Sequence, residues 1–282
     1  MIRIRLEVGY RGTNFYGWAR QPDVVSIQET LEEALFRVLR FDGLHTVVAG
    51  RTDTGVHARR QVVHFDVPEH LWRKVVGRSD RTPEQSVLVK VNKILPRDIV
   101  LYQARVAPAG FDARFSALDR TYKYRIADRY ENRDPLRLDS VLWHNYGLDT
   151  NKMNAAAAPL IGLNDFAAFC KARPGATTIR ELKRLTWERP TEGADRGLAV
   201  ATIVSDAFCH NMVRALVGSL LVVGDGQKGV EWPTTMLNSR SRVNSSAVLP
   251  ACGLTLHDVA YPADDQLAAR ANAVRAMRMD EF

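Results

Sequence analysis

The chain carries one aspartate on a glycine turn beside an arginine. Asp53 lies in the string Gly50-Arg51-Thr52-Asp53-Thr54-Gly55. A carboxylate presented in this way can act as a nucleophile, as a general base, or as half of the carboxylate pair of an aspartic protease. The alternative without chemistry is a structural turn, in which the aspartate caps the backbone and the glycine takes a left-handed conformation.

The protease interpretation fails on the rest of the sequence. Two carboxylates must share one proton, so a single-chain enzyme needs a second D-T-G or D-S-G. Val141 follows the string Asp139-Ser140, and Asn151 follows the string Asp149-Thr150, so neither string is a second motif. A dimer would supply a second aspartate, but Arg51 stands two residues before Asp53 and would hold the carboxylate ionised. A shared proton is therefore disfavoured in either arrangement.

The sequence lacks the motifs that indicate a bound cofactor, a metal site or a disulfide framework. It contains no G-x-G-x-x-G after a strand, no Walker loop and no clustered metal ligands. His57 and His64 have no third ligand at a suitable spacing, so structural roles are expected. The cysteines are far apart and odd in number, which argues against a disulfide framework and a zinc knuckle; they are Cys170, Cys209 and Cys252. We expect three buried free thiols and a reducing cytoplasm.

The composition is that of an ordinary soluble globular protein. Of 282 residues, 46% are hydrophobic and 25% are charged. No apolar run is long enough to cross a membrane, and the amino-terminal residues show no signal-peptide pattern. The net charge is +7, and 31 of the 39 basic residues are arginine. Arginine suits phosphate binding, but a genome rich in G and C also raises arginine content, so charge alone favours an anionic partner only modestly.

Hydrophobic periodicity predicts an α+β fold that presents these residues. Apolar alternation predicts strands over 3–10, 47–49, 61–67, 99–107, 121–128, 178–189, 198–208 and 253–261. Helical spacing predicts helices over 26–40, 82–95, 151–161, 210–224 and near 230–238. Ser26 is the expected N-cap of the first helix, with Glu29 at the capping-box spacing. We expect mainly antiparallel strands in an extended sheet, with helices packed on one face.

The pattern occurs twice along the chain. We expect one half over 1–108, which carries the aspartate turn, and a similar half over 109–262, which completes a basic cleft. Residues 263–282 are rich in alanine and arginine and are expected to form a helical tail.

The wider string around Asp53 resembles a known signature. Residues 50–58, GRTDTGVHA, resemble the G-R-T-D-A-G-V-H-A of the tRNA pseudouridine synthase A family, with Thr54 in place of alanine. Further strings follow in the order of that family: YRGTNFYGWARQ, SIQETLEEAL, FDARFSALDRTYKYRI, AFCHNMVRALVGSLLVVG and CGLTLHDVAY. A second departure is Cys209-His210-Asn211, where the family more often has two adjacent histidines.

The resemblance implies an isomerase that converts uridine to pseudouridine at positions 38 to 40 of the tRNA anticodon stem-loop. It implies the pseudouridine synthase fold, no cofactor or metal, and a homodimer that binds tRNA. The main alternative is a non-catalytic tRNA-binding or tRNA-folding module, which would need the basic cleft but not the carboxylate.

The resemblance also implies roles for individual residues. Asp53 is the catalytic residue, and Tyr122 stacks on the flipped-out uracil. Arg214 points inward to pair with Asp53, and Leu254 packs on the target base. Arg51 either holds the flipped nucleotide or fills its vacancy in the stem, with a phosphate contact or a surface ion pair as the alternative.

Two further arginines directly follow the signature. Arg59 and Arg60 are expected to meet the RNA backbone near the site. Tyr124, two residues beyond Tyr122, is expected to be a core or sheet-surface tyrosine.

Overall fold

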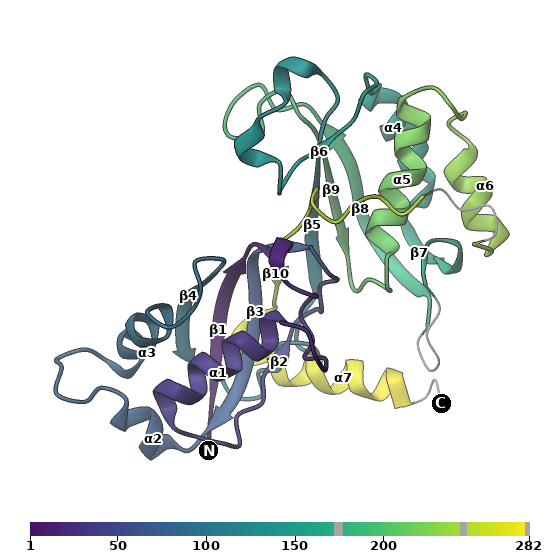
Figure 1. Ribbon diagram of the computed structural model, residues 1–282. Coiled ribbons are helices and arrows are strands. Elements are labelled where there is room, and N and C mark those ends of the chain that lie inside the picture. Colours follow the sequence, from purple (N-terminus) through teal and green to yellow (C-terminus); the bar gives the residue numbers. More distant parts are fainter. Residues whose placement is uncertain (172–176, 243–246, 280–282) are drawn as a thin grey trace. The chain divides into compact units, whose positions relative to one another are not determined.

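The computed structural model describes residues 1–171, 177–242 and 247–279, and they form two compact units (Figure 1). The first unit is Met1–Leu118 together with the chain from His257 onward, and the second is Asp119–Leu256. The C-terminal segment therefore belongs with the amino-terminal residues. The division into two similar halves, 1–108 and 109–262, stays a prediction.

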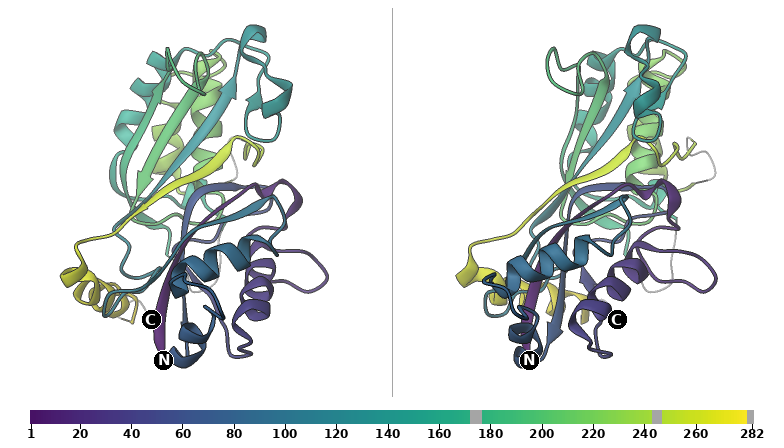
Figure 2. Two further views of the ribbon diagram at one scale, coloured as in Figure 1. Left: turned by 90° about the vertical axis from the view of Figure 1, so that its left-hand side faces the viewer. Right: turned by 60° about the vertical axis from the view of Figure 1, so that its left-hand side comes forward.

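The first unit is an antiparallel sheet with helices on both sides (Figures 1 and 2). Its elements are β1 (Ile2–Tyr10), η1 (Gly12–Asn14), α1 (Ile27–Leu39), β2 (Val47–Val48), β3 (His57–Val67), α2 (Glu69–Lys74), α3 (Pro83–Asn92), β4 (Ile99–Val106), η6 (Asp264–Gln266) and α7 (Leu267–Met279). Helices α1 and α3 lie on one face of this sheet, and α7 lies on the opposite side (Figures 1 and 2). Strand β1 lies between β3 and β4. Because side chains alternate along a strand, Ile4, Leu6 and Val8 are buried on one face of β1, whereas Arg3 and Arg5 lie on the other.

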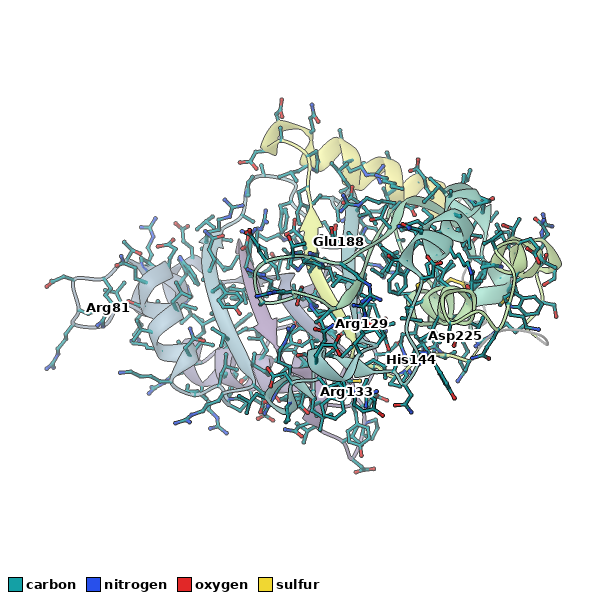
Figure 3. All side chains as sticks on the ribbon, turned by 90° about the horizontal axis from the view of Figure 1, so that it is seen from above. Arg81, Arg129, Arg133, His144, Glu188 and Asp225 are labelled. Carbon is teal, nitrogen blue, oxygen red and sulfur yellow. A yellow bond between two sulfur atoms is a disulfide. The ribbon has the colours of Figure 1, made fainter. Side chains whose placement is uncertain are left out.

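Local signals set the ends of the helices in this unit. The Ser26 side chain accepts a hydrogen bond from the Glu29 amide, so the predicted N-cap of α1 is confirmed. Thr82 and Gln85 form a complete capping box at the start of α3. In the loop between α2 and α3, Arg81 points away from the sheet at the edge of the structure (Figure 3).

The C-terminal helix is docked on the first unit. Leu267 and Ala271 are each 1% exposed, and Arg275 forms an ion pair of 2.7 Å with Asp112. The predicted helical tail is confirmed as a helix that contributes to the core of this unit.

The second unit is also an antiparallel sheet, in the order β5, β9, β8, β7. Its elements are β5 (Asp119–Ala127), η2 (Tyr130–Asn132), η3 (Pro135–Arg137), β6 (Leu142–Trp143), α4 (Thr150–Ala157), η4 (Ala158–Leu160), β7 (Gly162–Asp165), η5 (Ala167–Phe169), β8 (Ile179–Glu188), β9 (Ala199–Ser205), α5 (Met212–Gly224) and α6 (Trp232–Ser239). Strand β10 (Leu254–Ala260) carries the chain back to the first unit. The predicted α+β class, with mainly antiparallel strands and packed helices, is confirmed.

A polar cluster fastens the long connection between β5 and α4. The Arg133 guanidinium donates to the His144 carbonyl at 2.7 Å and lies over the rings of Tyr130 and Trp143. His144 Nε2 lies 3.5 Å from a carboxylate oxygen of Asp225, which directly follows α5 (Figure 3). The exposed connection is therefore tied to the helical side of this unit.

In the part of the chain that the structure describes, no helix is both long and apolar enough to cross a membrane.

Candidate active site

Asp53 lies at the start of a tight turn in the first unit. The Val56 amide donates to the Asp53 carbonyl at 3.1 Å, and Gly55 has φ +76°, which a side chain would strain. Asp53 is half-buried, whereas Thr54 is exposed. The threonine in place of the expected alanine is therefore accommodated at the surface.

The segment that joins β1 to α1 wraps around this turn. The Trp18 amide donates to the Thr52 carbonyl at 3.0 Å, and the Gly55 amide donates to the Phe15 carbonyl at 3.3 Å. Gly12 packs so closely on Val56 that a Cβ would overlap the Val56 carbonyl oxygen. The turn is thus held by a loop that precedes it by about 40 residues along the chain.

A buried polar network lies beneath the same turn. The Tyr10 hydroxyl is 2.7 Å from the Thr52 hydroxyl and accepts from Gln61 Nε2 at 3.2 Å. Gln61 Nε2 also donates to the Gly50 carbonyl at 2.8 Å. No local sequence signal predicts a role for Tyr10 or Gln61, because 51 residues separate them and only the pairing of β1 with β3 brings them together.

The three arginines beside the turn differ in their partners. Arg51 and Arg59 are exposed and form no ion pair with any residue that the structure describes. Arg60 instead donates to Glu7 at 2.8 Å, with Asp258 at 3.8 Å. The hydrogen bond from Arg60 to Glu7 raises the pKa of the guanidinium. Arg60 is thus neutralised by its own unit, whereas Arg51 and Arg59 are available to an anion.

His57 and His64 have structural roles, as expected. His57 Nδ1 accepts from the Gly12 amide at 3.0 Å, and His64 Nδ1 accepts from the Ala113 amide at 3.0 Å. Burial, assisted by the positive charge of Arg3, lowers the pKa of His64 to about 4. His64 is therefore neutral at physiological pH. Among the described residues, no three side chains of His, Cys, Asp or Glu are grouped for a metal ion.

Tyr122 lies in β5 of the second unit and is 7% exposed. The ring of Phe208 meets it edge to face, with 5.1 Å between centroids. Tyr124 is fully buried, and its hydroxyl donates to the Pro250 carbonyl at 2.7 Å. Burial raises the pKa of Tyr124 well above its ordinary value. Tyr124 is thus a core residue, and Tyr122 is the one that keeps a small exposed area.

Arg214 and Leu254 lie beside one segment of the second unit. Arg214 is the third residue of α5, and its Nε donates to the Leu249 carbonyl. Leu254 opens β10 and is 5% exposed. Just before it, a Cβ on Gly253 would collide with the Tyr124 ring at 2.6 Å. Segment 249–254 therefore packs on both the arginine and the core tyrosine.

The cysteine prediction was wrong for two of the three residues. Cys170 and Cys209 form a disulfide with their Cα atoms 5.6 Å apart, which lies within the usual range. Beside it, the Lys171 amide donates to the His210 carbonyl at 2.9 Å. Cys252 is free, and burial raises its pKa. This disulfide could not be predicted from sequence, because its cysteines are 39 residues apart and lie close together only in the folded chain.

Comparison with known proteins decides the family. The family model described as tRNA pseudouridine synthase matches residues 156–262. A tRNA pseudouridine synthase A of Bifidobacterium longum is 46% identical over 99% of both chains. The chain belongs to the tRNA pseudouridine synthase A family. A second member, from Streptomyces griseus, is 47% identical over 98% of this chain and 94% of its own. A third member, from Cutibacterium acnes, is 44% identical over 99% and 95%.

The similarity to tRNA pseudouridine synthase A proteins extends over both units of the chain. The family model matches only the second part of the chain, but the relatives extend over nearly its full length, including the turn of Asp53. The resemblance predicted from short strings is therefore confirmed. The roles of Asp53, Arg51, Tyr122, Arg214 and Leu254 stay predictions.

Proposed function

We propose that this chain isomerises uridine to pseudouridine at positions 38, 39 and 40 of the tRNA anticodon stem-loop. The observation that carries this proposal is the full-length similarity to proteins named tRNA pseudouridine synthase A, together with a carboxylate on a braced turn. The proposed substrate base lies in an RNA stem, so it must be flipped out before a side chain can reach it.

The proposed reaction breaks the N1–C1′ bond of uridine, rotates the uracil and forms a C5–C1′ bond. The proton on C5 is lost to solvent and N1 gains a proton, so the reaction is balanced without an oxidant or a donor group. Asp53 acts as the carboxylate, by attack at C1′ or C6 or by removal of the C2′ proton. Each of these three routes uses the same side chain on the same turn.

Four further residues are proposed to bind the flipped nucleotide. Tyr122 stacks on the uracil, which contributes roughly 1–3 kcal/mol to binding of the extruded base. Leu254 packs on the same base, and Arg214 pairs with the Asp53 carboxylate. The exposed Arg51 either contacts the flipped nucleotide or fills the space that this nucleotide leaves in the stem.

We also propose a homodimer and a cytoplasmic location. Both rest on the family resemblance and on the tRNA substrate. The cysteines do not support the cytoplasmic location, because Cys170 and Cys209 form a disulfide and disulfides are rare in a reducing cytoplasm.

The test of the function is tritium release from tRNA that carries [5-³H]uridine. The wild-type chain is expected to release tritium from tRNA with uridine at positions 38 to 40, and not from tRNA with cytidine at all three. If the chain binds tRNA but releases no tritium, it is a binding or folding module and the proposed function is wrong.

The different partners of Arg59 and Arg60 predict different salt effects. Arg59→Gln should weaken tRNA binding and reduce the slope of log affinity against log salt by about 0.7–0.9, the contribution of one phosphate contact. Arg60→Gln is the matched control and should leave the slope unchanged, because its guanidinium is held by Glu7. Filter binding between about 50 and 200 mM salt measures both slopes. Equal slopes for the two variants would contradict the assignment.

A further inference from the structure

The network beneath the Asp53 turn is closed to solvent. Tyr10 is 5% exposed, Thr52 is 6% exposed and Gln61 is fully buried. Buried polar groups persist when their hydrogen bonds are satisfied, and a satisfied network fixes the position of its members. These three side chains come from two strands and from the turn itself, so the network ties the turn to the sheet.

The side-chain amide of Gln61 is held through both of its polar atoms. Gln61 Oε1 accepts from the Val62 amide at 3.2 Å, which fixes the orientation of the side-chain amide. Gln61 Nε2 therefore donates both to Gly50 and to the Tyr10 hydroxyl. The Tyr10 hydroxyl also shares a hydrogen bond of 2.7 Å with the Thr52 hydroxyl. Burial raises the pKa of Tyr10 to about 12, so this hydroxyl keeps its proton at neutral pH.

The network acts on the two residues that flank Arg51, directly before Asp53. It holds Gly50 through its carbonyl and Thr52 through its hydroxyl. On the other side of Asp53, the turn is closed by the Val56 amide and by the contact of Gly55 with Phe15. The backbone of the aspartate is thus fixed on both sides, although it lies in an irregular segment between β2 and β3.

We propose that Tyr10 and Gln61 are positioning residues that set the place of the Asp53 carboxylate through Thr52 and Gly50. This inference rests on the proposed function. A carboxylate that must reach one atom of a flipped nucleotide depends on its placement, and a shift of about 1 Å can cost on the order of 100-fold in rate. The network supplies this placement without contact with the substrate.

Tyr10→Phe tests the proposal, because it removes one oxygen and keeps the ring that packs 6.0 Å from Trp18. In tritium release, kcat should fall by about 10- to 100-fold, whereas KM and the Kd for tRNA stay within about twofold. Thr52→Val should reproduce this loss, and Thr52→Ser should restore near-normal kcat because it keeps the hydroxyl. The double variant Tyr10→Phe/Thr52→Val should be no worse than the poorer single variant, because both remove the same hydrogen bond.

Tyr102→Phe is the matched control. Tyr102 lies in the neighbouring strand β4, is 54% exposed, and should retain wild-type kcat without its hydroxyl. The proposal is overturned if Tyr10→Phe keeps kcat within twofold, or if its loss lies wholly in KM. It is also overturned if Thr52→Ser is as slow as Thr52→Val, and this pair decides the matter should Tyr10→Phe fail to fold. A wild-type chain without tritium release refutes the proposed function instead, so the two failures are distinct.

Discussion

Asp53→Asn is expected to abolish tritium release and to leave tRNA binding nearly unchanged. The amide has the size of the carboxylate but neither its negative charge nor its ability to accept a proton or to form a covalent intermediate. Loss of an essential group of this kind lowers kcat by at least about 10³-fold. Single-turnover tritium release measures the loss, and filter binding measures the Kd for tRNA.

Thr54→Ala is the matched control for this substitution. Thr54 is the exposed neighbour of Asp53 on the same turn, and alanine is the residue that the family signature has there. Its kcat should stay within about twofold of the wild-type value. Release by Asp53→Asn within tenfold of wild type would show that the Asp53 carboxylate is not needed for the chemistry.

Asp128→Ala is expected to cause the largest loss of stability among the ion pairs of the second unit. The Asp128 side chain is fully buried and takes two hydrogen bonds from Arg189 and one of 2.7 Å from the Leu148 amide. Removal of one partner of a buried pair leaves a charge without compensation and costs about 3–5 kcal/mol. The free energy of unfolding in urea, followed by circular dichroism, measures this cost.

The same carboxylate also predicts a dependence on pH. Burial raises the pKa of Asp128, but the hydrogen bonds from Arg189 and Leu148 outweigh it, so the pKa lies below its ordinary value. The stabilisation is therefore present above that ordinary value, and it is lost as the pH falls through the lower pKa of the folded state.

Lys152→Ala is the control for Asp128. Lys152 is 59% exposed and lies 3.9 Å from Asp149, so its removal should change the free energy of unfolding by less than about 1 kcal/mol. A loss below about 1 kcal/mol for Asp128→Ala would show that the buried pair contributes no more than this surface pair.

Local features of the chain could be predicted from sequence because their causes are local. The N-cap at Ser26 and the helix predicted over 210–224, which begins at Met212 in the structure, follow from neighbours within one or two turns. The ends were less exact, since the helix predicted over 151–161 leaves the α conformation after Ala157, where Pro159 lies in a 3₁₀ turn. The short strand β7 lacks a clear alternation of side chains and was not predicted.

The features that the sequence did not predict depend on contacts between distant residues. Glu7 neutralises Arg60 across 53 positions, and Gln61 reaches Tyr10 across 51. The disulfide between Cys170 and Cys209 likewise joins residues that only the fold brings together. For the site itself, the resemblance identified the turn of Asp53, but the network that holds the turn became visible only when β1 was paired with β3.

The first unit is built from two separate segments of the chain, which has a consequence for its synthesis. It combines two stretches that are far apart in sequence, because α7 packs on Gly110, Asp112 and Ser116. A ribosome synthesises the whole second unit before the last helix of the first. Compact units generally fold as they emerge, the amino-terminal one first. Here that order is reversed, because the unit that carries Asp53 is completed only after the second unit has been synthesised.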